Sequence, residues 1–323
     1  MLGGFFALLS AATFAINNVS ARRGVVSGSV VQALAITVPI GVPLFALLVL
    51  ASGSWGALWS FSENQLWILA AAGVVHFVWG RYCFYRATKA LGSILVAPLQ
   101  QLSMLVALVL AVVLLGEKLT PLRIIGLVLV IWGPILAVQD AGKGSPKPEG
   151  GWQPNYVEGY FWGLLSVLGT GLSPILVRAA VEGMGAGAAL AGGLISYIAG
   201  TIVFVAAVVA TGQVAHAVSM DRQNALWFAN AGFFVFLSHV FRYLAYVYAP
   251  VTVVAPIERT TVLFRLAFSY FLNREHEVFH GRVILATIMS LVGAVLLTLS
   301  TDAVANLGFL PDWLREASRW QWP

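Results

Sequence analysis

Long, uninterrupted runs of apolar side chains restrict the fold of this chain more than any other feature. A helix needs about 20 predominantly apolar residues to cross the hydrocarbon core of a bilayer. Ten runs approach or reach this length, and none alternates as a membrane-spanning strand would. We therefore predict an all-α polytopic membrane protein with ten transmembrane helices. The predicted spans are Leu2–Val19, Val31–Ala51, Leu66–Ala87, Ile94–Leu115, Leu122–Val138, Gly159–Val177, Ala188–Ala210, Ala225–Tyr248, Val251–Leu272 and Val283–Leu299.

Composition supports a membrane protein and argues against a soluble or nucleic-acid-binding one. Only 10% of the residues are charged, whereas about 25% of the residues of a soluble domain are charged. The formal net charge of +5 includes no basic block interleaved with aromatic side chains. Such a block would have indicated a nucleic-acid partner.

A segment rich in Gly, Pro, Lys and Glu follows the fifth run and predicts a solvated linker. It divides the chain into a first five-helix repeat at 1–138, a linker at 139–157 and a second five-helix repeat at 158–300. Residues 301–323 form a Trp- and Arg-containing tail, predicted to lie in the membrane interface or to be a disordered end. Five crossings per half give the halves opposite orientations, so we predict an inverted-topology repeat.

The two halves also match in sequence. "LLSAATFAINNVSAR" (Leu8–Arg22) aligns with "LLSVLGTGLSPILVR" (Leu164–Arg178) at an offset of 156 residues. The fourth and ninth predicted helices align at an offset of 158 residues. Matched positions are Glu117 with Glu275, Gln100 with Glu258, Gln101 with Arg259 and, across a three-residue gap, Arg81 with Arg242.

The late part of each half carries a related sequence pattern. In Ala97–Gly133 of the first half, Gly-Glu-Lys follows a long apolar helix. The second copy, Ala255–Gly293, has Asn273-Arg274-Glu275 at the equivalent place. This pattern resembles that of the EamA-type members of the drug/metabolite transporter superfamily. The resemblance implies ten helices around a central cavity in the plasma (inner) membrane, with the third, fourth, eighth and ninth helices lining it. It does not identify the substrate, since the superfamily moves amino acids, sugars, amines, nucleotide sugars and drugs.

Several ionisable side chains lie inside the predicted spans, where each costs at least about 2.5–3.5 kcal/mol at the bilayer centre. Arg242 and Glu258 are equally distant from Pro250, near the turn between the eighth and ninth helices. An antiparallel pair of helices would therefore bring them to similar depth, and an ion pair would offset part of the desolvation. Such groups either mark a transport pathway or hold helices together in satisfied pairs. We predict a substrate-binding cluster of Glu258, Arg259, Arg242, Arg265, Arg81, Gln100, Gln101, Tyr82, Tyr243, His239 and Asn17.

The charges of this cluster bear on the substrate. Four arginines face one carboxylate, which favours a substrate with a carboxylate or phosphate group. The tyrosines of the same spans would equally suit a cation or an aromatic amino acid. We therefore predict a secondary active transporter that moves a small polar metabolite, either an anion or an amino acid, by alternating access within the lipid bilayer. A proton is a candidate coupling ion at Glu258, although a neighbouring Arg opposes protonation.

Two alternatives to a metabolite transporter are open. One is a flippase that binds a lipid phosphate through the arginines. The other is a membrane-embedded zinc protease, because "HEVFH" matches the H-E-x-x-H motif at His276, Glu277 and His280. That motif lies in the connector between the last two predicted helices, and no clear third ligand follows it. We therefore expect no metal, no cofactor and no enzymatic activity.

Overall fold

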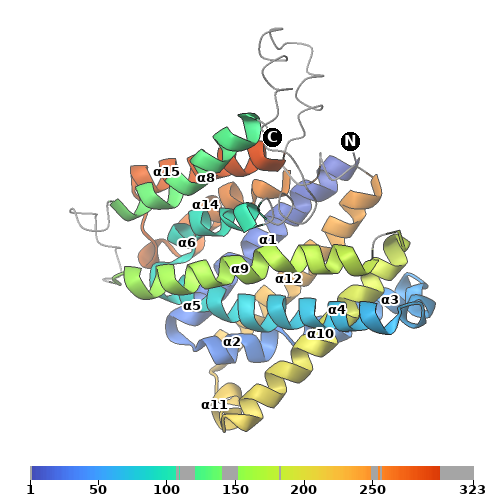
Figure 1. The fold of residues 1–323 in the computed structure, drawn as a ribbon. Coiled ribbons are helices and arrows are strands. Elements are labelled where there is room, and N and C mark those ends of the chain that lie inside the picture. Colours follow the sequence, from blue (N-terminus) through green and yellow to red (C-terminus); the bar gives the residue numbers. More distant parts are fainter. Residues whose placement is uncertain are drawn as a thin grey trace.

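The computed structural model describes residues 2–106, 109, 121–139, 152–181, 183–248, 254 and 257–298. Within these ranges every regular element is a helix, as the apolar runs predict (Figure 1). The predicted C-terminal tail, most of the predicted linker, Glu117 and Pro250 lie outside the described residues.

The helices follow the order of the apolar runs. In the first half they are α1 (Leu2–Ser27), α2 (Val30–Thr37), α3 (Gly41–Ala51), the 3-10 helix η1 (Ser54–Trp59), α4 (Glu63–Gly73), the π-helix η2 (Val74–Gly80), α5 (Arg81–Leu91), α6 (Ser93–Gln101) and α8 (Pro121–Gln139). In the second half they are α9 (Tyr156–Val181), α10 (Gly185–Ala210), α11 (Val214–Val218), α12 (Arg222–Tyr248), α14 (Thr261–Leu272), the 3-10 helix η3 (Arg274–His276) and α15 (Gly281–Thr298).

Six helical segments of the described chain are long and apolar enough to cross a membrane. They are Leu2–Ser27, Val30–Ala51, Glu63–Leu91, Tyr156–Val181, Gly185–Ala210 and Arg222–Arg242. Three shorter apolar helices cover Ser93–Val106, Arg123–Ala137 and Gly281–Leu297. Large apolar side chains stay exposed on these helices, as Ile202 (63% exposed) and Val209 on α10 illustrate. A lipid-facing surface explains that exposure, because lipid does not penalise apolar side chains. The total of ten spans stays a prediction.

Local sequence signals fix the points where helices begin and turn. Ser29 caps α2: its Oγ accepts a hydrogen bond from the Gln32 backbone N–H, while the Gln32 side chain accepts one from the Ser29 backbone N–H. Between α5 and α6, Gly92 adopts a φ of +85°, a conformation that glycine reaches without strain. A Cβ at this position would lie 2.5 Å from the Glu277 carboxylate. Glycine therefore lets Glu277 approach the start of α6.

Equivalent helices of the two halves make equivalent contacts. Helix α1 packs along α12 and also touches α14, and its counterpart α9 packs along η2 and α5 and also touches α6. Helices α8 and α15, which end the two halves, lie side by side (Figure 1). This pattern is what two repeats of one five-helix unit would give. The inverted relation between the halves stays a prediction.

Glycines let α8 and α15 approach closely. A Cβ at Gly293 would lie 2.7 Å from the Gly126 carbonyl oxygen and 2.7 Å from the Val130 backbone nitrogen. A Cβ at Gly133 would meet the Ser290 side chain. Gly126, Gly133 and Gly293 are therefore positions where the two helices touch, as small residues are in membrane helix pairs.

Gly293→Leu is expected to force α8 and α15 apart and to reduce the yield of folded protein sharply. The obstructing atoms belong to the backbone, so no side chain can turn aside to make room. Size-exclusion chromatography in detergent, with and without a heating step, measures the folded fraction. Gly281→Leu is the matched control, because a Cβ at Gly281 meets nothing within 4 Å. Equal yields of the two variants would contradict the close approach.

Candidate functional site

A buried carboxylate lies where α1, α12 and the residues preceding α14 meet. Glu258 Oε1 is 2.6 Å from Arg242 Nε on α12, and its side chain is 9% exposed. The same oxygen accepts a hydrogen bond from Ser10 Oγ on α1 at 3.0 Å. The facing Arg–Glu pair predicted from equal distances to Pro250 is confirmed.

Two serines bring α1 and α12 together beside this carboxylate. Ser238 Oγ donates to the Ser10 carbonyl oxygen at 3.0 Å. The single hydroxyl proton of Ser10 is shared between Glu258 Oε1 and the Ser238 carbonyl oxygen, which both lie 3.0 Å from Ser10 Oγ. Both side chains are buried. Small polar residues of this kind allow close helix approach in membranes and satisfy each other's hydrogen bonds. They therefore fix the position of Ser10, which in turn orients Glu258.

Arg81 lies at the junction between the π-helix η2 and α5. Its Nη1 donates to the Thr37 carbonyl oxygen at 2.6 Å, and its Nη2 donates to the Tyr197 hydroxyl at 3.5 Å. The guanidinium also lies over the Phe77 ring, 5.0 Å from the centroid. These partners are neutral, so they hydrogen-bond the cation without cancelling its charge. π-Helical turns occur frequently at functional sites, and η2 ends where Arg81 begins.

Two imidazoles, those of His76 and His239, lie near each other within the bundle. The rings of His76 on η2 and His239 on α12 have centroids 6.4 Å apart, and His239 is also 6.4 Å from Tyr197. Both histidines lie within electrostatic range of Arg81 and Arg242. The Nδ1 atom of His76 is buried without a hydrogen-bond partner among the described residues. We name Ser10, His76, Arg81, Tyr197, His239, Arg242 and Glu258 the central polar cluster.

Several other residues predicted for the substrate-binding cluster lie at different places in the bundle. Gln100 Nε2 on α6 donates to Ser166 Oγ on α9 at 2.6 Å, and Gln101 is buried. Asn17 is buried on α1; with its amide nitrogen facing α12, it donates to the Ala231 carbonyl oxygen at 3.0 Å. Arg259 is partly buried, and the Tyr243 side chain lies outside the described residues.

Arg265, also predicted for the site, is buried on α14 away from a direct carboxylate partner. It is 4% exposed, and its Nε and Nη1 atoms have no hydrogen-bond partner among the described residues. The charge of Glu277 acts on it electrostatically. Among the described contacts, Arg265 makes no ion pair within 4.0 Å with Glu258 or Glu277.

The contacts of Glu258 and Gln100 are related by the sequence match between the halves. Ser10 and Ser166 are paired at the offset of 156 residues, and Gln100 and Glu258 at the offset of 158. Each serine hydroxyl bonds the side chain of the other matched pair: Ser10 with Glu258, and Ser166 with Gln100. Both contacts join the first half to the second, and one of them carries a charged side chain, Glu258, where the other carries a neutral one, Gln100.

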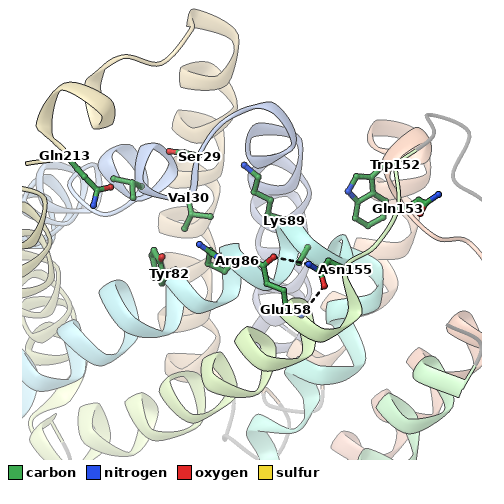
Figure 2. A pocket seen from close by; sticks show the side chains of 12 residues that line it. Ser29, Val30, Tyr82, Arg86, Lys89, Trp152, Gln153, Asn155, Glu158 and Gln213 are labelled. Atoms are coloured by element: carbon green, nitrogen blue, oxygen red, sulfur yellow. Dashed lines mark hydrogen bonds and ion pairs between the residues drawn. The ribbon is translucent and has the colours of Figure 1, made fainter. Parts of the chain in front are cut away.

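Tyr82 lines a cavity of 510 Å³ at the ends of α5 and α9, which we name the Lys89 cavity (Figure 2). It includes none of the other predicted site residues. Its lining residues are Ser29, Val30, Val31, Tyr82, Arg86, Lys89, Ala90, Trp152, Gln153, Asn155, Glu158 and Gln213.

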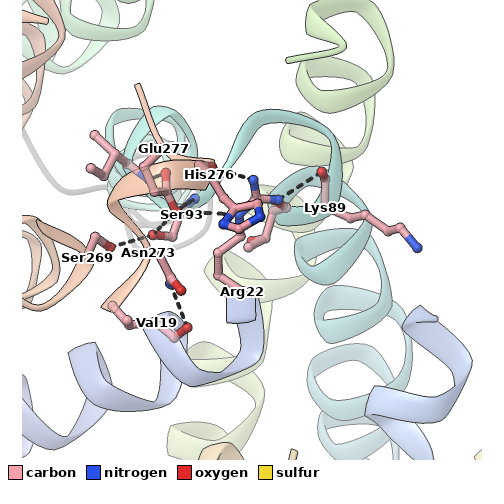
Figure 3. A network of polar contacts seen from close by, with 10 residues as sticks. Val19, Arg22, Lys89, Ser93, Ser269, Asn273, His276 and Glu277 are labelled. Carbon is pink, nitrogen blue, oxygen red and sulfur yellow. Dashed lines mark hydrogen bonds and ion pairs between the residues drawn. The ribbon is translucent and has the colours of Figure 1, made fainter. Parts of the chain in front are cut away.

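A second buried polar network joins the end of α1 to the connector after α14 (Figure 3). The side chains of Arg22 and Glu277 are 0% exposed, with 3.6 Å between Arg22 Nε and Glu277 Oε1. Glu277 accepts hydrogen bonds from the backbone N–H groups of Ser93 and Ile94 at 2.7 and 3.0 Å. It therefore caps the N-terminus of α6, where a negative charge is favoured.

This network also removes the geometric basis for a zinc site at "HEVFH". Glu277 has an extended backbone, with φ −132° and ψ 150°, so His276 and His280 do not lie on one face of a helix. The Glu277 carboxylate is occupied by the start of α6 and by Arg22. Burial, followed by the charges of Arg22 and Arg23, lowers the pKa of His276.

Sequence reasoning missed His76, Tyr197 and Ser10 as members of the central polar cluster. His76 is an ionisable residue inside the third predicted span and could have been found on that ground. Ser10 lies within the aligned segments and is matched with Ser166, so the alignment of the two halves could have pointed to it. No sequence signal marks Tyr197, which reaches Arg81 from α10.

The fold and the buried polar groups define a polytopic helical membrane protein, and comparisons with known proteins identify its family. The sequence model of the EamA-like transporter family matches residues 1–139. An uncharacterized transporter in the cobO 3' region of a Sinorhizobium species is 30% identical over 132 residues, covering 41% of this chain and 93% of that protein. The chain belongs to the EamA-like transporter family, which confirms the resemblance to that family, and the protein is a multi-pass membrane protein.

A solved crystal structure supports the fold over most of the chain. It shares 16% sequence identity, covers 91% of this chain and 94% of its own, and superposes with a TM-score of 0.57. At this identity the similarity concerns the fold alone.

Proposed function

We propose that this protein is a secondary active transporter that moves a small polar metabolite, an anion or an amino acid, across the plasma or inner membrane by alternating access. The observation that carries the proposal is the Arg242–Glu258 pair, held by Ser10 where α1, α12 and the start of α14 converge. Ionisable groups at such depth usually face a substrate pathway. Because the chain belongs to a transporter family, we take this pathway to be the route of a transported substrate.

Alternating access is supported by the correspondence between the halves. Ser10 with Glu258 and Ser166 with Gln100 are matched contacts on matched helices. Transporters built from inverted repeats rock one unit against the other around a site at their interface. Because one of these two contacts between the halves is charged and the other is neutral, the two rocking states would differ in energy.

An anionic substrate is favoured by the cations of the bundle. Arg242 is paired with Glu258, and its side chain remains 34% exposed. Arg81 and Arg265 make no ion pair within 4.0 Å in the described part of the chain. A carboxylate or phosphate would supply the missing charge, and arginine binds such groups in bidentate geometry.

Counterflow in proteoliposomes tests the mechanism. Candidate anions, zwitterions and cations are first ranked by the rise in melting temperature that each gives the purified protein, since a ligand of the folded state stabilises it. Vesicles loaded with the best ligand are then expected to take up the labelled ligand faster than empty vesicles. A carrier with alternating access exchanges substrates in this way, whereas a channel does not. Equal uptake by loaded and empty vesicles would contradict alternating access.

A further inference from the structure

We propose that the Lys89 cavity is a binding site for a small organic anion, with a carboxylate or phosphate group on a flat apolar body. The cavity shares no lining residue with the central polar cluster. Its volume of 510 Å³ falls within the range of about 300–1,000 Å³ typical of small-molecule sites. That this anion is also the transported substrate rests on the proposed function. That the cavity binds an anion does not depend on it.

Glu158, the carboxylate among the described residues of the cavity wall, is already satisfied by its neighbours. Glu158 Oε1 is 2.5 Å from Arg86 Nη2, and Glu158 Oε2 accepts a hydrogen bond from Asn155 Nδ2 at 3.3 Å. Asn155 Oδ1 in turn accepts a hydrogen bond from the Glu158 backbone N–H at 3.2 Å. Figure 2 shows this group of three side chains against one wall. Glu158 is therefore a poor partner for the positive group of a ligand.

The lysine of the wall retains capacity for a ligand. Lys89 Nζ donates one hydrogen bond, to the Gly28 carbonyl oxygen at 2.8 Å, and an ammonium group carries three donors. The Lys89 side chain is exposed at the cavity, so it can move toward a ligand. Among the charged side chains of the lining, Arg86 and Lys89 outnumber Glu158. The polar capacity left in the cavity is thus cationic and donor-rich, which selects an anion.

Aromatic side chains give the cavity an apolar surface. Tyr82, Arg86 and Lys89 are spaced i, i+4 and i+7 and share one face of α5. Trp162 packs edge-to-face on Tyr82 at 5.6 Å and lies 5.1 Å from the Arg86 guanidinium, which holds both side chains in place. Trp152 lines the cavity from the segment before α9. Aromatic walls with a few placed polar groups are typical of sites for flat organic ligands.

The cavity adjoins the network that links the two halves. The Arg22 guanidinium lies 4.3 Å from the Trp152 ring centroid, and Arg22 Nη1 donates to the Lys89 carbonyl oxygen at 3.0 Å. A ligand in the cavity would thus touch two residues that hold Arg22. This location suits an entrance site whose occupancy is sensed by the network between the halves.

Charge-selective binding tests the inference. The purified full-length protein is placed in nanodiscs of zwitterionic lipid and titrated with phenylacetate, phenylacetamide and 2-phenylethylamine, which have similar shapes and different charges. Phenylacetate is expected to raise the melting temperature with increasing concentration, and the amide and amine to do so far less. Equal stabilisation by all three ligands would overturn the proposal, because the site would then not select charge.

Variants locate the effect in the cavity. Lys89→Gln is expected to weaken phenylacetate binding about tenfold or more, as the loss of a charge-assisted hydrogen bond predicts, while Lys89→Arg retains binding. Arg282→Gln, which removes an exposed cation at the start of α15, is the control and should bind as the unaltered protein does. Unchanged binding by folded Lys89→Gln would overturn the proposal.

A lipid headgroup carries the same anionic chemistry, so the titration is repeated in nanodiscs containing phosphatidylglycerol. If this lipid stabilises the unaltered protein but not Lys89→Gln, and displaces phenylacetate, a lipid rather than a soluble anion occupies the site, and the proposal is overturned. Glu258→Gln should keep phenylacetate binding. If the unaltered protein binds phenylacetate but shows counterflow of none of the ligands, the proposed transport function is refuted and the anion site is left intact.

Discussion

Glu277→Gln is expected to lower the melting temperature more than any other single neutral substitution of an acidic residue in the described helices and connectors. Glu277 accepts hydrogen bonds through both oxygens, from the Ser93 and Ile94 backbone N–H groups and from Ser93 Oγ. An amide has only one oxygen, so one backbone N–H group would face an NH₂ group. The substitution also leaves Arg22 buried without its counter-charge. Breaking a buried pair in this way costs about 3–5 kcal/mol.

The surroundings of Arg22 explain why it cannot turn toward water. Its Nη1 donates to the carbonyl oxygens of Thr88 and Lys89, and its Nη2 to that of His276 at 2.5 Å. The guanidinium is also covered by the Trp152 ring. Removal of Glu277 therefore leaves a fixed, buried cation. The double variant Arg22→Gln/Glu277→Gln should lose less stability than the two single variants together.

Glu158→Gln is the control for this measurement. Its pair with Arg86 has side chains that are 36% exposed on both sides, and exposed pairs contribute only about 0–1 kcal/mol. Fluorescence-detected size-exclusion chromatography after stepwise heating gives the melting temperature of each variant. If Glu277→Gln melts at the same temperature as Glu158→Gln, the Arg22–Glu277 network does not hold the two halves together.

Sequence reasoning succeeded where a feature is local or symmetric along the chain. Apolar runs determine helices in a membrane because each backbone N–H and C=O group must be satisfied within its own segment. The Arg242–Glu258 pair was predictable because the two residues belong to consecutive antiparallel helices and are equally distant from the turn. The distance of 2.6 Å between Arg242 Nε and Glu258 Oε1 bears this out.

The same reasoning failed where partners are far apart in the chain. The first predicted span ends at Val19, which leaves Arg22 outside it, yet α1 continues to Ser27 and Arg22 is fully buried. Its burial depends on Glu277, which no local pattern connects with it. Glu277 drew attention only through the H-E-x-x-H pattern, and that pattern assumes a helix that the extended backbone at Glu277 does not form.

The π-helix η2 illustrates a second limit. Its sequence, Val74–Gly80, is almost wholly apolar, so hydrophobic periodicity cannot tell a π-helical turn from an α-helical one. The difference decides which way Arg81 and His76 point. Arg81 consequently binds the Thr37 carbonyl oxygen and the Tyr197 hydroxyl. Arg242, which the alignment of the halves matches with Arg81, binds a carboxylate instead. Two arginines at matched positions thus have different kinds of binding partner.

Glu258→Gln is expected to reduce uptake in proteoliposomes to near background while the protein stays folded. The amide can still accept the hydrogen bond from Ser10, so the helix junction keeps its shape. It cannot neutralise Arg242, whose Nε lies 2.6 Å from the carboxylate oxygen. The initial rate of uptake per folded molecule is the measured quantity. Glu63→Gln, an exposed carboxylate in the first turn of α4, is the control and should transport normally.

Exchanging Arg242 and Glu258 tests whether their ion pair only stabilises the fold or also takes part in transport. The double variant Arg242→Glu/Glu258→Arg restores opposite charges at the same junction. If the pair only holds α12 to the start of α14, the exchange should restore uptake together with stability. If Glu258 takes part in the transport cycle, the carboxylate is needed beside Ser10, and the exchanged protein should be folded but inactive. We expect the second result, because Ser10 Oγ bonds the carboxylate itself and the Arg242 side chain stays 34% exposed in spite of the pair. Restored uptake would show that Arg242 and Glu258 are a helix clamp and that the substrate binds elsewhere.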